Sequence, residues 1–242
     1  MSQVCRSRGC SCKATEWGHV LDEMDCELFA RASHERVYEP GMNIFMQGDN
    51  CSGVYCIQSG LVGLRRSDDN GNSAMLRLSQ NGDVLGYRAV IGKRQHRNTA
   101  EVLTRSRVCF IEAARLTMLL QRNPNLKEGF LQRALVDLTT TETNCAEQMT
   151  RGLQARFLHL LFRLYQNVEA QQDDREHVFD LPVQRKDIAA LLGATPESIS
   201  RIINRLEEQG LVRFVGRRVI FSNMGRFRAK IQIGIEAATA EA

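Results

Sequence analysis

The chain has 242 residues, 43% of them hydrophobic, and its formal net charge of +4 at pH 7 is mildly basic. This length and composition predict a globular protein with a larger body and a small attached module, and they permit a nucleic-acid partner without requiring one. No apolar run approaches the roughly 18 residues of a membrane span, and no apolar signal region follows the N-terminus, so we expect a cytoplasmic protein.

Residues 1–30 form a polar N-terminal segment that is distinguished by its cysteines. Cys5, Cys10 and Cys12 lie within eight positions, and Cys26 follows them. In a long chain without an export signal, cysteines are more often reduced thiols, metal ligands or redox sensors than disulfide partners. Basic residues beside the trio would lower the pKa of these thiols, so the segment favours thiolate chemistry.

Residues 31–122 predict an antiparallel β-roll or sandwich. Short alternating runs extend from about Arg36 to Ile111 and are broken by turn sequences such as Asn70-Gly71 and Asn81-Gly82. The glycines of these pairs supply the positive φ that tight turns require. We therefore expect short strands joined by tight turns.

Residues 123–166 predict a long helix that begins at an Asn123-Pro124 cap. Along it, a set of residues recurs at alternating spacings of four and three: Leu131, Leu135, Leu138, Glu142, Cys145 and Met149. This seam indicates a partner helix, and we expect a homodimer, although a helix packed on its own domain is the alternative. A carboxylate at Glu142 would be costly in a plain core and favours an interface between two copies.

Residues 167–242 begin with a polar linker and continue as a predicted winged helix-turn-helix. The stretch RKDIAALLG predicts a short helix closed by Gly193, and Pro196 opens a second helix that extends to about Gln209. The stretch LVRFVGRRVIF then predicts two strands around Gly216, which form the wing. The module is therefore of a kind that binds DNA.

The second helix of this module has side chains suited to reading bases. Glu197, Ser200 and Arg201 are predicted to face outward, where an arginine fork matches guanine, a carboxylate accepts from cytosine and a hydroxyl can do either. Arg185 at the start of the first helix and Arg217 on the wing are predicted to hold phosphates. An exposed helix with ordinary solvated charges is the alternative interpretation.

These patterns together resemble the transcription regulators of the Crp/Fnr superfamily, from about Glu39 to Phe221. The resemblance implies an α+β fold with a cyclic-nucleotide-binding-like β-roll, a long dimerisation helix and a winged helix-turn-helix, and RNA polymerase as a further partner. The segment PESISR is similar to the E-x-x-S-R pattern of the Fnr branch, which implies a TTGAT-type palindrome as the DNA target. No nucleophile–base set or metal-hydrolase motif is present in the sequence, so we expect no enzyme activity.

Members of this superfamily that bind cyclic nucleotides carry a glutamate after the glycine of the phosphate-binding segment, followed by an arginine and a serine or threonine. Here Tyr87 and Arg88 stand where the glutamate is expected, while Arg97 and Thr99 are retained. The nucleotide site is therefore incomplete. A nucleotide or another small molecule in the β-roll stays as an alternative signal.

The oxygen-sensing Fnr proteins hold a 4Fe-4S cluster with three N-terminal cysteines and one from a V-C-x-I stretch at the end of the β-roll. The stretch SRVCFIE is similar, so the resemblance implies a cluster held by Cys5, Cys10, Cys12 and Cys109, with Cys26 as an alternate ligand. The spacing of the trio, four residues and then one, differs from the common Fnr spacing of two and then five. The hypothesis is a regulator that senses oxygen, nitric oxide or redox state.

Three other sensing chemistries fit some of these residues. A dithiol switch would use the same thiols, whereas zinc usually takes paired cysteines with short gaps on both sides. Haem would need a histidine ligand. The candidates are His19, His34, His96, His159 and His177, and none of them stands in a recognisable haem-binding motif. The other cysteines are predicted to be structural. Cys51 is expected in a turn, Cys56 in the core and Cys145 on the helix seam.

Overall fold

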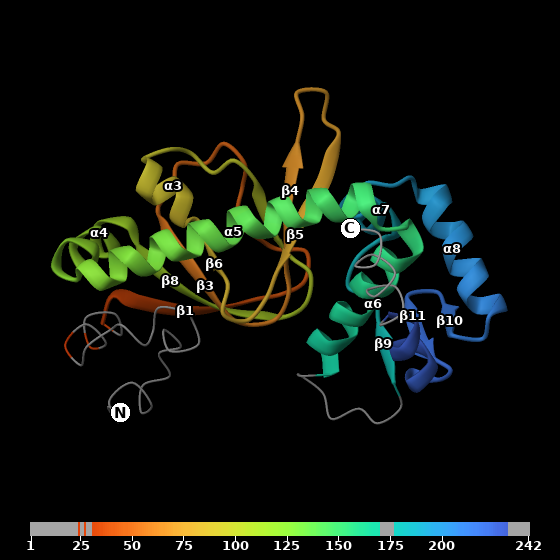
Figure 1. Ribbon diagram of the computed structural model, residues 1–242. Coiled ribbons are helices and arrows are strands. Elements are labelled where there is room, and N and C mark those ends of the chain that lie inside the picture. Colours follow the sequence, from red (N-terminus) through yellow and green to blue (C-terminus); the bar gives the residue numbers. More distant parts are fainter. Residues whose placement is uncertain (1–23, 25–26, 28–30, 170–176, 232–242) are drawn as a thin grey trace. The chain divides into compact units, whose positions relative to one another are not determined.

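The computed structural model describes residues 24, 27, 31–169 and 177–231 (Figure 1). Contacts divide the chain into two compact units, residues 1–140 and 141–242. Within the described ranges, no helix has the length and apolar character needed to cross a membrane. Cys5, Cys10, Cys12 and Cys26 lie outside the described residues.

The first unit is built on two antiparallel four-stranded sheets, which confirms the predicted β-roll. One sheet has the order β1 (Ser33–Tyr38), β8 (Ser106–Glu112), β3 (Gly53–Ser59) and β6 (Val84–Leu85). The other has the order β2 (Asn43–Phe45), β7 (Thr99–Val102), β4 (Val62–Ser67) and β5 (Ser73–Ser79). Short helices follow β6 and β8, namely α3 (Tyr87–Gly92) and α4 (Ala113–Arg122).

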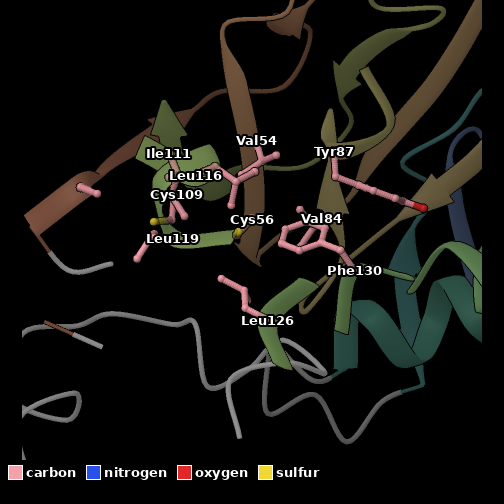
Figure 2. Close-up of a cluster of buried hydrophobic side chains, with 11 residues drawn as sticks. Val54, Cys56, Val84, Tyr87, Cys109, Ile111, Leu116, Leu119, Leu126 and Phe130 are labelled. Carbon is pink, nitrogen blue, oxygen red and sulfur yellow. The ribbon is translucent and has the colours of Figure 1, made fainter. Parts of the chain in front are cut away.

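The alternation of β3 places its side chains in two separate cores. Tyr55 and Ile57 belong to a cluster that joins residues of both sheets. Val54 and Cys56 face the opposite way, into a second cluster that includes α4 and the first turns of the next helix (Figure 2). Because successive strand residues point to opposite faces, one short strand supports both cores.

The long helix α5 (Pro124–Thr150) begins where the sequence predicts. Asn123 caps it by accepting a hydrogen bond at Oδ1 from the Leu126 amide at 3.0 Å. The buried side chains of the helix are Leu126, Phe130, Arg133 and Asp137. They recur at spacings of four, three and four, so one stripe of α5 packs on the β-roll.

The predicted seam of α5 lies away from that stripe. Its apolar members are exposed in the single chain, with Leu131 at 54%, Leu135 at 48% and Leu138 at 54% of full accessibility. Glu142 and Cys145 are also exposed. The alternative in which the seam packs on its own domain is therefore wrong for these residues, and the seam is available to a second helix.

The second unit contains α6 (Leu153–Glu169) and the predicted winged helix-turn-helix. Its elements are β9 (Val178–Asp180), α7 (Arg185–Leu191), α8 (Pro196–Glu208), β10 (Val212–Val215) and β11 (Arg218–Phe221), and the strands pair in the order β10-β11-β9. Residues 224–231 form a further helical stretch. Aromatic rings from α6, two strands and this stretch make the core: Tyr165, Phe179, Phe221 and Phe227.

Candidate nucleic-acid interface and sensory site

The start of α8 is fixed by a side-chain cap. Thr195 accepts a hydrogen bond at Oγ1 from the Ser198 amide at 3.3 Å, and Pro196 occupies the first turn. Apolar residues at helical spacing then bury one face of the helix: Ile199, Ile202, Ile203 and Leu206. A threonine cap and a proline in the first turn are typical of a helix start, so the local sequence defines where α8 begins.

The opposite face of α8 presents the side chains predicted to read bases. Glu197 and Arg201 are exposed. The Glu197 backbone amide, the Thr195 hydroxyl and the Arg201 cation hold the pKa of the Glu197 carboxyl below its usual range. The Ser200 hydroxyl donates to the Pro196 carbonyl at 3.0 Å, which leaves its lone pairs as acceptors. The helix therefore offers an ionised carboxylate, a hydroxyl and a guanidinium.

The two arginines predicted to hold phosphates differ in their surroundings. Arg185 is exposed at the first position of α7. Arg217, in the turn between β10 and β11, donates from Nε and Nη2 to the Leu181 carbonyl at 3.1 and 2.8 Å. Its guanidinium therefore anchors the wing to the segment before α7, and the second N–H of Nη2 and both N–H groups of Nη1 are not used by these two bonds. This long-range contact was not predicted from the sequence.

Cys109 lies in β8 directly opposite Cys56 in β3. Both side chains are buried in the second core of the first unit (Figure 2). Burial raises the pKa of the Cys109 thiol, although a hydrogen bond with the Ser33 side chain opposes the shift. Burial also raises the pKa of Cys56. The prediction that Cys56 is a core residue is confirmed, but its pairing with Cys109 was not foreseen.

Ala32 and β1 lie beside Cys109. Ala32 is a member of the same buried cluster, and β1 pairs with β8 so that Glu35 lies opposite Cys109. Within the ranges that the structure describes, no group of three or more histidine, cysteine or acidic side chains is arranged to hold a metal ion.

The segment that corresponds to a nucleotide phosphate site begins at Gly86, whose φ of 82° starts α3. Tyr87 is buried, and its hydroxyl donates to Asp137 Oδ2 in α5 at 2.8 Å. Burial and this carboxylate raise the pKa of Tyr87 to about 12. Arg97 is exposed, while Thr99 accepts a hydrogen bond at Oγ1 from the Gln47 amide at 3.0 Å. The Tyr87 hydroxyl is therefore used in a hydrogen bond to α5.

A charge network surrounds that tyrosine, with Asp137 and Arg133 buried and Arg77 and Asp83 half-buried. Asp137 Oδ1 lies 2.7 Å from Arg77 Nη1 and 3.2 Å from Arg133 Nε. Arg133 also pairs with Asp83, and Arg77 Nη2 lies 3.5 Å from the Asp83 carboxylate. Five side chains from β5, the following loop, α3 and α5 thus share their charges and hydrogen bonds. This network was not predicted, although the spacing of Arg133 and Asp137 on one face of α5 was a usable signal.

Comparisons with known proteins agree with this architecture. Residues 35–123 match the family model "Cyclic nucleotide-binding domain", and residues 155–230 match "Crp-like helix-turn-helix domain". The Fumarate and nitrate reduction regulatory proteins of Escherichia coli (strain K12) and Salmonella typhimurium are each 25% identical over 205 residues, which cover 85% of this chain and 80% of the relative.

Solved structures share the fold. FixK2 from Bradyrhizobium japonicum is 21% identical, with a TM-score of 0.65 over 81% of this chain and 96% of that one. A putative transcriptional regulator of the Crp/Fnr family from Eubacterium rectale is 15% identical, with a TM-score of 0.72 over 91% of this chain and 99% of that one. The two matched domains together span more than half of the sequence. The chain therefore belongs to the Crp/Fnr family of DNA-binding transcription regulators, which are not enzymes.

Proposed function

We propose that this regulator senses oxygen, nitric oxide or redox state through a 4Fe-4S cluster held by Cys109 and three cysteines of the N-terminal segment, drawn from Cys5, Cys10, Cys12 and Cys26. The observation that carries the proposal is the position of Cys109, a buried thiol on β8 beside β1, the strand that follows the N-terminal segment in the chain. The 25% identical relatives named as fumarate and nitrate reduction regulators add support.

The donor chemistry at Cys109 fits such a cluster. A buried thiolate without a cation is costly, and burial accordingly raises the pKa of Cys109. Coordination to iron would stabilise the thiolate in an apolar setting, where solvent access is restricted. The cluster would supply the redox chemistry, and Cys109 would anchor it to the β-roll.

The iron content of cysteine variants tests this assignment. Protein purified without air is expected to contain iron and sulfide and to lose its visible absorbance in air. Cys109→Ser should contain little iron, whereas Cys145→Ser, a change at an exposed cysteine of α5, should match the wild type. Cys56→Ser is expected to keep its iron because Cys56 packs in the core.

Three other results would each point elsewhere. Wild-type iron in Cys109→Ser would overturn the ligand set, and loss of iron in Cys56→Ser would add Cys56 to it. If no variant binds iron after reconstitution with iron and sulfide, the cluster is refuted and the N-terminal dithiol switch replaces it.

We also propose that the DNA target is a TTGAT-type palindrome bound by a homodimer, which acts with RNA polymerase. The outward Glu197, Ser200 and Arg201 support the half-site, and the exposed seam of α5 supports pairing with a second copy. Two recognition helices related by a two-fold axis would then enter successive major grooves. Arg185 and the free part of Arg217 would contact phosphates on either side.

Replacing Arg201 tests the half-site. Arg201→Ala should lower affinity for the palindrome by roughly 1–3 kcal/mol per half-site and weaken discrimination at one base. Arg205→Ala is a matched control, because Arg205 is an exposed arginine of the same helix that the motif does not include. Equal affinities of Arg201→Ala and wild type at matched salt would refute the role of Arg201.

A small-molecule effector in the β-roll is a second candidate function, favoured by the match to the cyclic nucleotide-binding domain and by the exposed Arg97. Against it, Tyr87 is bonded to Asp137 and Thr99 to the Gln47 amide. Calorimetric titration with cyclic AMP and cyclic GMP decides between the two. Binding that is lost in Arg97→Ala and kept in Arg94→Ala, a change at a nearby exposed arginine, would favour this function.

A further inference from the structure

The junction between α5 and α6 is closed by local contacts in the second unit. α5 ends at Thr150 and α6 begins at Leu153. The Arg151 amide donates to the Glu147 carbonyl at 3.0 Å, and the two side chains form an ion pair at 2.8 Å. The last turn of α5 therefore continues into a defined bend rather than an open loop.

Arg156, in the first turns of α6, connects this bend to the helix-turn-helix. Its Nε donates to the Arg151 carbonyl at 3.2 Å, and its Nη1 donates to the Leu192 carbonyl. Leu192 is the C-cap of α7, and Arg151 directly follows the end of α5. A single guanidinium thus satisfies carbonyls at the C-terminal ends of two helices, where a cation is favoured by the helix dipole.

A close approach of backbone and side chain supports the same connection. Gly193, which begins the turn between α7 and α8, has a φ of 59°. A Cβ atom at this position would lie 3.0 Å from Gln148 Oε1 at the end of α5. Glycine is therefore favoured there by its left-handed φ, and a Cβ would need only the flexible end of the Gln148 side chain to move by a few tenths of an ångström.

We propose that Arg156 is a positioning residue for DNA recognition, which holds the end of α5 and the turn before α8 as one piece. This inference rests on the DNA-binding part of the proposed function and is independent of the iron–sulfur cluster. α8 begins three residues after Gly193, so the orientation of its outward face follows that of the turn.

The test compares Arg156→Ala, Arg156→Lys and Arg163→Ala. Arg163 is an exposed arginine of α6 and controls for the lost charge. The wild-type protein first selects a duplex from a random pool, so that failure of the TTGAT assignment does not affect the result. Dissociation constants for this duplex and for a scrambled duplex are then measured at one salt concentration, and hydrogen exchange is followed in peptides that contain residues 189–196.

Arg156→Ala should lose roughly ten- to a hundredfold in affinity for the selected duplex, a range typical of coupling between sites, and about twofold or less for the scrambled one. Exchange should accelerate in 189–196 but not in the middle of α6. Arg163→Ala should keep the wild-type ratio of the two affinities. Arg156→Lys should fall between, because an ammonium lacks the fork that reaches two carbonyls.

A wild-type ratio in folded Arg156→Ala, or an equal loss for both duplexes, would overturn the proposal. If Arg156→Ala does not fold, the ratio of affinities for the selected and scrambled duplexes is measured on Arg156→Lys instead. A wild-type ratio together with wild-type exchange in 189–196 would then overturn it, and a selective loss would support it.

Discussion

Asp137→Ala is expected to destabilise the first unit more than any single change at its surface. The carboxylate is buried in α5 and accepts from the Tyr87 hydroxyl at 2.8 Å, from Arg77 at 2.7 Å and from Arg133 at 3.2 Å. Its removal leaves a buried phenol without an acceptor and two guanidinium groups with Asp83 as their remaining shared partner.

The expected cost follows from these lost contacts. Breaking a buried ion pair by removing one partner costs about 3–5 kcal/mol, because the other charge stays buried. Asp83 compensates part of this, so we expect about 3 kcal/mol for Asp137→Ala. Asp137→Asn keeps an acceptor for Tyr87 and should cost roughly 2 kcal/mol, since the lost part is the charge.

Urea unfolding followed by circular dichroism measures these differences, at a fixed protein concentration because association contributes to stability. Asp69→Ala is the matched control, since Asp69 is an exposed carboxylate of the same unit and should change stability by less than about 0.5 kcal/mol. A loss below about 1 kcal/mol in Asp137→Ala would refute the view that the network is a tightly coupled buried unit.

The pH dependence provides an independent test of the same network. Burial alone would raise the pKa of Asp137, but Arg77, the Tyr87 hydroxyl and Arg133 together hold it below its usual 3.8. A depressed pKa stabilises the folded state above 3.8, and this contribution is lost as the pH falls through the folded-state pKa. The difference in free energy of unfolding between wild type and Asp137→Asn should therefore shrink as the pH falls below the folded-state pKa of Asp137. A difference that is constant down to pH 2.5 would contradict the ionised state.

Three further outcomes follow from other parts of the molecule. Burial lowers the pKa of His96 and of His159 in the folded state, so the urea midpoint of unfolding should fall as the pH drops below 6.5. The fall should be smaller in His96→Asn, and equal wild-type midpoints at pH 7.5 and 5.5 would contradict this. Gly86→Ala should destabilise more than Gly71→Ala, since both have positive φ but only Gly86 would place its Cβ 2.7 Å from a backbone oxygen; equal unfolding midpoints would count against the close packing. Leu138→Glu should give a monomer in sedimentation because it places a charge in the apolar seam, whereas an unchanged dimer would locate the interface elsewhere.

Much of the secondary structure was predictable because it depends on neighbours in the sequence. The Asn123-Pro124 start of α5, the Thr195 cap of α8 and the turn glycines all act within a few residues of themselves. The outward face of α8 follows from helical spacing alone. Such features are determined by local geometry, so a correct pattern is enough to predict them.

The candidate sensory site shows where local patterns are not sufficient. A V-C-x-I stretch identified Cys109, but the register of β3 against β8 placed Cys56 opposite it. The residue that replaces the expected nucleotide-binding glutamate, Tyr87, proved to be a buried partner of Asp137, fifty residues away in the chain. Neither partner can be found from spacing, because strand register and helix packing bring distant residues together.

The sequence by itself therefore determined the order of the β-roll, the long helix and the winged helix-turn-helix, the starts of α5 and α8, and the chemistry of the recognition face. Only the tertiary structure decided which groups the charged side chains bond. Arg217 bonds the Leu181 carbonyl, and Arg156 joins the ends of two helices. An arginine in the sequence is equally suited to solvent, to phosphate or to a carbonyl, and its role is settled by which unsatisfied group the fold brings within hydrogen-bonding distance.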